Sequence, residues 1–596
     1  MSAVHKLITD HLDIWTAADT EKKSGRGRAS GNANGVYGIK KLRELILELA
    51  VRGKLVPQDP IDEPASELLK RIQAEKTKLV AEGKIKKDKP QAAISENEYP
   101  FELPHDWKWA RLSEITSGMD SGWSPACLEN NSPSNNVWGV LKTTSVQVMQ
   151  YLEDENKELP ERLIPRPEAE VKVGDILITR AGPTNRVAIS CLVQSTRPRL
   201  MISDKIIRFH PIEVGIDGRF LALCLNAGAT AAFLERAKSG MAASQVNISQ
   251  EKLRQAPIPI APLRIQHRIV AKVDELMALC DQLETQHNNA ADAHEQLVSH
   301  LLSTLTQSKD AADFNANWQR IATHFDTLFT TESSIDALKQ TLLQLAVMGK
   351  LVPQDPNDEP ASELLKRIQV EKARLSADGR PKKEKPPSHF EDNIPYSIPK
   401  HWEWVSIENI SEVGTGATPL RTKNEYFTPP SIPWVTSGET SSPFIFKTEQ
   451  FVSPLALNET NLTVYPKGTL IVAMYGQGKT RGQITELMID ACTNQACAAI
   501  KLVCDDECHR KYVKLFFEKI YDEIRELAAG GAQPNLNLSK VKETLLPLPP
   551  LIEQLRIVTR LDELMNICDQ IKTRITRTNL IQQRLANILV EESSAI

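Results

Sequence analysis

The chain has 596 residues, 41% hydrophobic and 25% charged, with a formal net charge of −4. A chain of this length divides into several domains, and its composition is that of a globular protein. It shows no apolar run long enough for a membrane span or a signal peptide. The nine scattered cysteines suit a reducing compartment, so we expect a cytoplasmic protein that does not contact a membrane. The balanced charge weakens the case for a nucleic-acid ligand without excluding one, because Lys and Arg can still gather on one face.

The N-terminal part predicts a flexible segment over residues 1–37 and a helical region with a linker over 38–98. Glu21–Gly35 is polar and rich in Gly and Ser, which is typical of a flexible tract. An amphipathic helix is expected over Ile39–Val51, followed by the motif GKLVPQDP at Gly53–Pro60. A second helix then leads into a Lys-rich linker.

Residues 99–262 predict an α+β domain. Its first landmark is the pair Trp107 and Trp109, followed by short strand-like runs such as Asp175–Thr179 between Gly, Pro, Ser and Asn residues. A closing helix is expected over Gly218–Lys238. The Pro-rich stretch Pro257–Pro262 predicts an extended segment, because proline disfavours helix in the residue before it.

A long helix with heptad spacing is expected over 263–310. Its predicted apolar seam is Ile269, Val273, Leu276, Cys280, Leu283, His287, Ala290, His294, Leu297 and Leu301. Apolar residues at this spacing over several heptads indicate a coiled coil. We interpret the polar midpoint of the seam as packing defects or register devices.

The whole arrangement then occurs a second time. GKLVPQDP recurs at Gly349–Pro356, and Asp62–Gln73 recurs letter for letter at Asp358–Gln369. We expect a connector and second helical region over 311–394, a second α+β domain over 395–550 and a second coil helix over 551–596. In the second domain the matching landmarks are Trp402 and Trp404, the run Thr469–Ala473, a helix over His509–Ala529 and the Pro-rich Pro547–Pro550. The second seam is Ile557, Leu561, Leu564, Cys568, Ile571, Ile575, Thr578, Gln582, Leu585 and Leu589.

The repeat predicts an α+β fold of two similar domains separated by long antiparallel coiled-coil helices, with an internal pseudo-twofold repeat. We expect each coil helix to pair with the other, since the chain must return through a whole second domain. Two like domains held apart by a rigid bar would form a molecular ruler. Duplex DNA is a ligand of matching symmetry, and unlike domains would read two unlike half-sites.

Polar loops that follow the predicted strands are the candidate DNA contacts. They are Arg180–Arg186 and Tyr475–Gly482, Ser121–Pro125 and Thr418–Asn424, Lys142–Thr144 and Thr436–Glu439, and Ser244–Asn247 and Gln533–Asn537. The candidate residues are Ser121, Lys142, Thr143, Arg180, Thr184, Asn185, Arg186, Arg421, Lys423, Gln477, Lys479, Thr480 and Arg481. The alternative interpretation of each loop is a solvent-exposed turn that contacts no DNA. The last pair of loops is alike in both copies, which favours a structural turn or a backbone clamp.

Two other signals are rejected. Gly478-Lys479-Thr480 lacks the earlier glycine of a phosphate-binding loop, because Ala473 stands at that position. Cys504 and Cys508 lack the paired spacing of a zinc site, so we interpret them as free thiols. No catalytic motif is visible, and we expect no catalytic residue, metal or cofactor in this chain.

The motifs resemble those of the specificity subunit of type I restriction-modification systems. The resemblance rests on GKLVPQDP, the Trp-x-Trp pairs, GDILITRAG and PLPPLIEQLRIVTRLDEL, and it extends from about residue 38 to 596. The duplicated GKLVPQDP and the long N-terminal extension look most like the IB group.

The resemblance implies a non-catalytic subunit in which residues 99–262 and 395–550 are target-recognition domains for the two halves of a bipartite double-stranded DNA site. It also implies two modification subunits that carry S-adenosylmethionine and methylate adenine, docked on the helices. Two restriction subunits that use ATP and Mg²⁺ would complete the complex. A stand-alone DNA-binding regulator and a coiled-coil scaffold remain as alternatives.

Overall fold

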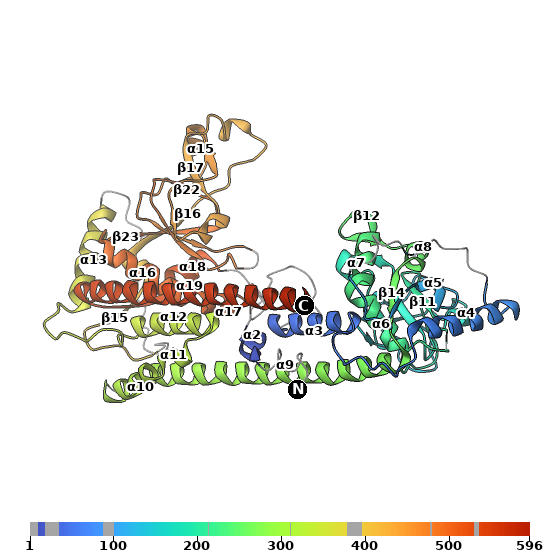
Figure 1. The fold of residues 1–596 in the computed structure, drawn as a ribbon. Coiled ribbons are helices and arrows are strands. Elements are labelled where there is room, and N and C mark those ends of the chain that lie inside the picture. The colour runs from blue at the N-terminus through green and yellow to red at the C-terminus, as the bar shows by residue number, and fades with distance from the viewer. Residues whose placement is uncertain are drawn as a thin grey trace. The chain divides into compact units, whose positions relative to one another are not determined.

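A computed structural model describes residues 10–17, 35–86, 94, 101–212, 214–309, 311–377, 396–476, 479–529 and 536–595. The chain forms two compact units, one of residues 1–291 with 578–596 and the other of residues 292–577 (Figure 1). Most of the predicted flexible N-terminal segment, and the segment 530–535, lie outside the described residues.

The first unit combines helices with a mixed α+β domain. Its helices outside that domain are α2 (Leu12–Ala17), α3 (Tyr37–Val51), α4 (Ala65–Ala81), the first part of α9 (Leu263–Thr306) and the last part of α19 (Leu551–Ala595). Helix α3 forms because Ile39, Leu42 and Ile46 repeat on one face, and all three are buried in the core of the unit.

In its described residues, the domain of the first unit contains fourteen strands with short helices between them. The strands are β1 (Lys108–Arg111), β2 (Asp120–Ser121), β3 (Gly139–Leu141), β4 (Val146–Gln147), β5 (Gln150–Tyr151), β6 (Asn156–Glu158), β7 (Ile176–Thr179), β8 (Ala181–Gly182), β9 (Ser190–Leu192), β10 (Leu200–Met201), β11 (Ile206–Phe209), β12 (Ser239–Ala242), β13 (Gln245–Asn247) and β14 (Pro257–Ile260). The helices are α5 (Leu112–Ile115), α6 (Gly218–Asn226), α7 (Gly228–Ala237), α8 (Gln250–Arg254), η2 (Thr143–Ser145), η3 (Pro167–Ala169) and η4 (Thr184–Arg186).

The second unit repeats this composition. Its helices are α10 (Ala311–Thr323), α11 (Phe325–Leu328), α12 (Glu332–Val347), α13 (Ala361–Ala377), α14 (Ile407–Ile410), α15 (Pro454–Glu459), α16 (Glu507–Lys519), α17 (Tyr521–Ala529), α18 (Leu538–Glu543), η5 (Asn424–Tyr426) and η6 (Ser437–Ser441). Its strands are β15 (Glu403–Ser406), β16 (Ser411–Thr415), β17 (Ile432–Val435), β18 (Phe444–Ile445), β19 (Gln450–Val452), β20 (Leu470–Ala473), β21 (Ile484–Leu487), β22 (Cys492–Thr493), β23 (Cys497–Leu502) and β24 (Leu545–Leu548).

The two domains share their strand topology. The order β2-β11-β7-β9 in the first recurs as β16-β23-β20-β21 in the second, where β18 adds an edge strand. The small sheet β10-β3-β6 recurs as β22-β17-β19, with one parallel and one antiparallel pairing in each. The Pro-rich segments form β14 and β24, each paired with the strand that carries the second tryptophan. The predicted α+β class with an internal repeat is therefore confirmed.

The closing helix of each domain is broken, which corrects the prediction of one continuous helix. Helices α6 and α7 are separated at Ala227, whose φ of −142° and ψ of 166° are extended. Gly228 then starts α7, and its backbone N–H donates to the carboxylate of Glu48 at 2.9 Å. Ile520 separates α16 from α17 in the second domain. The apolar periodicity runs through both breaks, which is why the sequence alone did not reveal them.

The GKLVPQDP motif ties each short helix to the domain that follows it. Its glycine has φ +71° at Gly53, and an added Cβ would lie 2.6 Å from Pro104 Cγ and 3.0 Å from the ring of Trp107. Gly349, with φ +68°, meets Pro399 and Trp402 in the same way. A side chain at either position would be strained and would clash, so the glycine is a packing requirement.

A second internal anchor joins the segment after the motif to the long helix. Arg268 Nη2 lies 2.5 Å from Asp62 Oδ2 in the first unit. In the second unit Arg556 Nη1 donates to Asp358 Oδ1 at 3.2 Å. Both aspartates are buried, so each is compensated by an arginine of the long helix of its own repeat.

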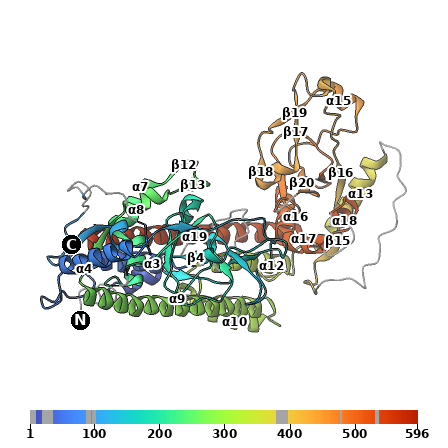
Figure 2. The same ribbon diagram turned by 90° about the vertical axis from the view of Figure 1, so that its right-hand side faces the viewer.

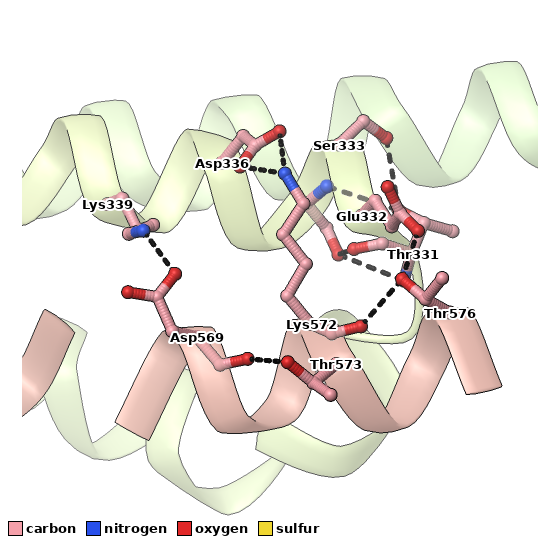
Figure 3. A network of polar contacts seen from close by, with 10 residues as sticks. Thr331, Glu332, Ser333, Asp336, Lys339, Asp569, Lys572, Thr573 and Thr576 are labelled. Atoms are coloured by element: carbon pink, nitrogen blue, oxygen red, sulfur yellow. Dashed lines mark hydrogen bonds and ion pairs between the residues drawn. The ribbon is translucent and has the colours of Figure 1, made fainter. Parts of the chain in front are cut away.

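Each long helix lies beside a short helix within a unit. Arg43 of α3 lies 2.6 Å from Asp281 and 2.8 Å from Glu284 of α9. Figures 1 and 2 both show α3 along α9. In the second unit the pairs Lys339–Asp569 (2.6 Å) and Lys572–Asp336 (2.7 Å) join α12 to α19 in antiparallel orientation (Figure 3). Among the described residues of each unit, ion pairs thus join the long helix to a short helix, and none joins it to the other long helix.

The long helices still run in opposite senses through the fold. Helix α9 begins in the first unit and ends in the second, whereas α19 begins in the second and ends in the first. Ala586 near the end of α19 is fully buried in the first core, and Val298 near the end of α9 is buried in the second. The two long helices are thus antiparallel, as predicted, and each of them contributes buried residues to both cores.

Beyond the midpoint of each long helix, the predicted seam is only partly correct, because Leu301 and Leu589 pack against the cores while one seam leucine of each helix does not. Ile269, Val273, Leu276 and Cys280 are buried as expected, but Leu297 is 50% exposed, and Leu585 of the second copy is 41% exposed. The residue after each, Val298 and Ala586, is buried instead. The heptad spacing therefore predicts the core face over the first half of each helix and only part of it over the second half.

Candidate nucleic-acid interface

In the first domain, the loop after β7 is anchored on three sides. Thr179 ends β7, and the backbone N–H of Arg180 donates to the Lys205 carbonyl at 2.8 Å. The Arg180 carbonyl accepts from Ile248 N–H at 2.8 Å. Strand β8, which lies within this loop, pairs with β13. The structure thus brings the predicted loops Arg180–Arg186 and Ser244–Asn247 together in one small sheet.

Arg186 joins a further predicted loop to this group. Its guanidinium donates to the carbonyls of Thr143 (2.8 Å) and Val146 (2.9 Å) and to Gln147 Oε1 (3.0 Å). Burial lowers the pKa of this arginine. These bonds commit Arg186 to holding the turn at Thr143–Ser145, so its geometry favours a positioning role.

The remaining predicted loop of this domain is connected through a segment that the sequence argument did not single out. Ser121 pairs with Ile207 of β11, and Gly122 N–H donates to the Ser203 carbonyl at 3.2 Å. The connection Ile202–Lys205 between β10 and β11 therefore lies between Ser121 and Arg180. In the sequence, this connection is a short polar stretch between two apolar runs. Many ordinary turns have the same pattern, so it did not stand out as part of a site.

The side chains around these loops differ in whether they form hydrogen bonds or ion pairs within the domain. Among the described residues, none pairs with the side chains of Arg180 and Lys205. Lys142 Nζ contacts Asn131 Oδ1 at 3.1 Å and Glu155 at 3.7 Å. Thr184 Oγ1 donates to the Ala243 carbonyl at 3.0 Å, whereas Asn185 is exposed at the tip of the loop. Arg180, Lys205 and Asn185 are thus the side chains best placed to meet a ligand.

The second domain builds the same corner with different residues. An added Cβ at Gly416 would lie 1.6 Å from the Thr493 carbonyl oxygen, as one at Gly122 would lie 1.7 Å from that of Ile202. Thr415 Oγ1 donates to the Cys497 carbonyl at 2.9 Å, and Met474 N–H donates to the Ala496 carbonyl at 2.8 Å. The connection Asn494–Ala496 thus takes the place of Ile202–Lys205, and Gln495 in it is exposed.

The next predicted loop of the second domain closes on itself and on β21. Thr436 N–H donates to Glu439 Oε2 at 2.7 Å, which caps the short helix η6. Thr440 Oγ1 lies 3.4 Å from Gln483 Oε1. The Thr436–Glu439 loop therefore adjoins the loop after β20, as the equivalent pair does in the first domain.

The other candidate residues of the second domain fall into two groups. Lys479, Thr480 and Arg481 follow one another beside α17, where the Tyr521 hydroxyl donates to the Lys479 carbonyl. Lys423 lies 2.6 Å from Glu459 and over the ring of Tyr426, whereas Arg421 is exposed. No described contact joins Arg421 and Lys423 to Lys479–Arg481. Gln477 lies outside the described residues.

The thiol- and histidine-rich stretch of the second domain has ordinary packing contacts. Burial raises the pKa of the Cys504 and Cys508 thiols. His509 is buried, its Nδ1 lies 2.9 Å from Gln554 Oε1, and burial lowers its pKa. His509 therefore serves as a neutral core residue that holds α16 against α19.

The chain thus holds two similar domains whose loops differ at one corner. Each domain is attached to a long helix that enters the other unit. The family described as "Type I restriction modification DNA specificity domain" matches residues 149–293 and 399–581. The chain belongs to this family. It is 37% identical over 602 residues to the type I restriction enzyme EcoEI specificity subunit of Escherichia coli, covering 99% of each chain.

Other relatives and solved structures are similar to the chain as well. The EcoAI specificity subunit of Escherichia coli is 37% identical over 600 residues, again covering 99% of both chains. The crystal structure of the HsdS subunit from Thermoanaerobacter tengcongensis is 17% identical and covers 83% of this chain and 98% of its own, with a TM-score of 0.39. The predicted family is therefore confirmed, while the IB grouping stays a prediction. Among the described residues, no helix is long and apolar enough to cross a membrane.

Proposed function

We propose that the chain is the DNA specificity subunit of a type I restriction-modification complex and that each domain reads one half of an asymmetric bipartite site. The observation that supports this most directly is the same strand topology with different side chains at one corner. Arg180 and Lys205 in the first domain stand where the second has Met474 and Ala496. Arg reads guanine through O6 and N7 in the major groove, which methionine cannot do. Equivalent corners with unlike donors would therefore select unlike bases.

The proposal places the two target-recognition domains at residues 99–262 and 395–550. It assigns direct contacts to Arg180, Asn185 and Lys205 in the first domain and to Arg421, Lys479, Thr480 and Gln495 in the second. Ser121, Lys142, Thr143, Thr184 and Arg186 would hold the corner or contact phosphate, because their side chains or backbones are engaged within it. Backbone contacts of this kind fix register without reading sequence.

The chain itself would be non-catalytic and would act in the cytoplasm. The proposed partners are two modification subunits with S-adenosylmethionine, which methylate adenine, and two restriction subunits with ATP and Mg²⁺. In support, the relatives over the full length are named specificity subunits of type I restriction enzymes.

Methylome sequencing after domain exchange tests the proposal. The chain is co-expressed with its modification partner in a host without adenine methylation, and we expect methyladenine in one bipartite motif. Replacing residues 99–262 with the domain of another specificity subunit should change one half of that motif only. Replacing residues 395–550 should change the other half, and this exchange is the matched control.

Two results would contradict the proposal. One is a methylome that stays unmodified although the complex assembles, and the other is a change in both halves after a single exchange. Tight sequence-specific binding by the purified chain alone, at moderate salt, would instead favour a stand-alone regulator.

A further inference from the structure

The loop after β7 and the loop after β20 close in the same way. In the first domain the N–H of Ala188 donates to the Thr179 carbonyl at 2.8 Å, and in the second the N–H of Gly482 donates to the Ala473 carbonyl at 2.8 Å. Ala188 has φ +66° and Gly482 has φ +84°, so both loops return through the left-handed region. The closing residue lies nine positions after its acceptor in each copy, so the two loops have equal length.

Equal length makes one exposed position of each loop equivalent. We call residues 180–188 the β7 loop and residues 474–482 the β20 loop. Asn185 and Lys479 each lie three positions before the closing residue, and both side chains are exposed. An amide can pair with adenine, whereas an ammonium group can contact guanine or phosphate. The two loops thus present different chemistry at the same place, and its use in reading bases requires a fixed loop backbone.

The backbone of the β7 loop is held by a residue outside the loop. Lys238 directly follows α7, and its Nζ donates to the carbonyl of Thr184, the neighbour of Asn185, at 2.8 Å. The Lys238 side chain is only 9% exposed, and its Nζ also contacts Glu235 at 2.5 Å. The N–H of Thr184 donates to the Ala243 carbonyl at 2.9 Å. Both backbone groups of Thr184 are therefore bonded, and Lys238 is too buried to serve as a phosphate contact.

The backbone of the β20 loop is held by a different side chain. Tyr521 is the first residue of α17, and its hydroxyl donates to the Lys479 carbonyl. Its ring lies against the end of the loop, because an added Cβ at Gly482 would lie 3.4 Å from Tyr521 Cδ2. The guanidinium carbon of Arg525 lies 5.3 Å from the centre of the same ring. Tyr521 therefore contacts both the closing glycine and the residue whose side chain is exposed.

The two holding residues belong to equivalent parts of the fold. Helices α7 and α17 are the segments that follow the breaks at Ala227 and Ile520, and each holding residue lies at one end of such a segment. Both hydrogen bonds end on a backbone carbonyl, a group that every residue has. Such a bond keeps the loop in place whatever side chain the loop presents. The loop side chains can thus differ between the copies while the loop position is maintained.

We infer that Lys238 and Tyr521 are positioning residues for sequence recognition, each of which fixes the exposed side chain of one loop through a bond to the loop backbone. The inference rests on the proposed function, in which each domain reads one half of the site. Reading a base edge requires a donor and an acceptor within hydrogen-bond distance. A loop that is held before DNA binds also loses less conformational freedom on binding. Removal of the holding bond should therefore reduce discrimination between bases.

The variants remove the holding bond and leave the loops themselves unchanged. Tyr521→Phe removes one hydroxyl group and keeps the ring, and Lys238→Met keeps an unbranched buried chain without its donor. Tyr512→Phe is the control in the second domain, because it removes a bond of the same kind, from a tyrosine hydroxyl to the Pro547 carbonyl at 2.7 Å. Glu235→Gln is the control in the first domain, because it removes the ion pair of Lys238 and keeps the bond to the loop.

The probe is a DNA duplex that carries the motif found by methylome sequencing with the wild-type chain. Two sets of duplexes carry single base-pair substitutions, one set in each half of the motif, and the domain exchange assigns each half to a domain. The complex of the chain with its modification subunit is titrated with each duplex. Discrimination is the ratio of the Kd for a substituted duplex to the Kd for the motif.

We expect each variant to affect one half only. Tyr521→Phe should lower discrimination about tenfold at one position of the half read by residues 395–550. Lys238→Met should do the same in the half read by residues 99–262. Both controls should keep all ratios, although Tyr512→Phe should lower the unfolding temperature because it leaves a buried carbonyl without its donor. Tyr521→Phe changes a single oxygen atom, so it carries the test even where Lys238→Met lowers the stability of its domain.

The outcomes separate this inference from the proposed function. Unchanged ratios with both variants, in a wild-type complex that discriminates in both halves, overturn the inference and leave the function intact. A fall in both halves caused by one variant, or weaker binding to every duplex by the same factor, also overturns it, because the bond would then serve general stability only. A wild-type complex that binds all duplexes equally well overturns the proposed function itself.

Discussion

The indole N–H of the first tryptophan in each Trp-x-Trp pair is satisfied in two different ways. Trp107 Nε1 donates directly to Gln58 Oε1 at 2.9 Å. Trp402 Nε1 donates to Glu553 at 2.9 Å, and the same carboxylate accepts from Gln354 at 2.6 Å. Burial raises the pKa of Glu553. Both rings are buried, so each tryptophan anchors the core of its own unit, and two different sets of hydrogen bonds satisfy the same buried N–H group.

The two arginines of the loop after β7 should respond differently to truncation. Arg180→Ala removes a cation that has no partner among the described residues, so the chain should keep its stability. If Arg180 reads a base, the recognised motif should relax at one position, with a loss of about 1–3 kcal/mol of binding free energy. Methylome sequencing with the Arg180→Ala subunit detects such a relaxed position.

Arg186→Ala should instead lower stability. It leaves the carbonyls of Thr143 and Val146 and the amide of Gln147 without their donor, at a cost of about 1–3 kcal/mol, toward the low end because the site is only half-buried. Hydrogen exchange in the peptide around Thr143–Ser145 should accelerate. Unchanged exchange there, or a specificity change with normal stability, would show that Arg186 reads DNA.

At the scale of elements, the buried positions of the long helices depart from the heptad spacing. Cys280 and Val298 are 18 residues apart, which is about five turns of an α-helix with 3.6 residues per turn. Cys568 and Ala586 have the same separation. A heptad seam drifts by about 20° per repeat relative to such a helix. The sequence pattern could not show that each helix would follow the 3.6-residue period and change cores along its length.

Sequence patterns predicted the helices and strands well, but they did not predict which loops would lie together. The strands β7 and β20 and the Pro-rich strands β14 and β24 were visible as apolar or proline-punctuated runs. The corner formed with Ile202–Lys205 was not visible, because its contacts join backbone groups far apart in the chain. The break at Ala227 was hidden for the same reason, since the Gly228 N–H next to it bonds to Glu48, far away in the chain. At Ile520 the structure shows only a local bond from its N–H to the Phe516 carbonyl.

The charges between short and long helices distinguish the two copies from each other. Asp336 of α12 faces Lys572, whereas the equivalent positions carry Lys40 in α3 and Glu284 in α9. Docking α12 on α9 would place Asp336 against Glu284, and docking α3 on α19 would place Lys40 against Lys572. Like charges at these positions disfavour exchange of the two short helices.

Reversal of one charge tests this pairing. Asp336→Lys should destabilise the second unit by about 0.5–1 kcal/mol, because it places two cations together on a half-exposed surface. Adding Lys572→Glu should recover most of the loss. A double-mutant cycle on urea midpoints measures the coupling. Additive losses in the double variant would show that the pair has no specific role, and Thr573→Ala on the adjoining turn serves as a background control.

At the scale of the whole molecule, each repeat completes the core of the other. The last part of α19 belongs to the first unit, where Ala586 is fully buried and Asn587 accepts a hydrogen bond from Tyr37 at 2.9 Å. The last part of α9 belongs to the second unit, where Val298, Leu302 and Leu305 are buried. Neither repeat therefore contains all the residues of its own core.

This exchange of helix ends predicts that a substitution in one repeat destabilises the other. Ala586→Glu should destabilise the first unit by about 3 kcal/mol or more, because it buries an unpaired carboxylate. Val298→Glu should do the same to the second unit. Hydrogen exchange should accelerate in α3 for the first variant and in α12 for the second, with the opposite helix unaffected.

The exposed neighbours provide matched controls for this experiment. Leu585→Glu and Leu297→Glu place the same charge one residue earlier, at side chains that are 41% and 50% exposed. Both controls should leave hydrogen exchange unchanged, since the new carboxylate stays in water. If Leu585→Glu were as disruptive as Ala586→Glu, the helix would follow the heptad seam after all. If Ala586→Glu accelerated exchange in α12 instead of α3, the end of α19 would complete the core of its own repeat.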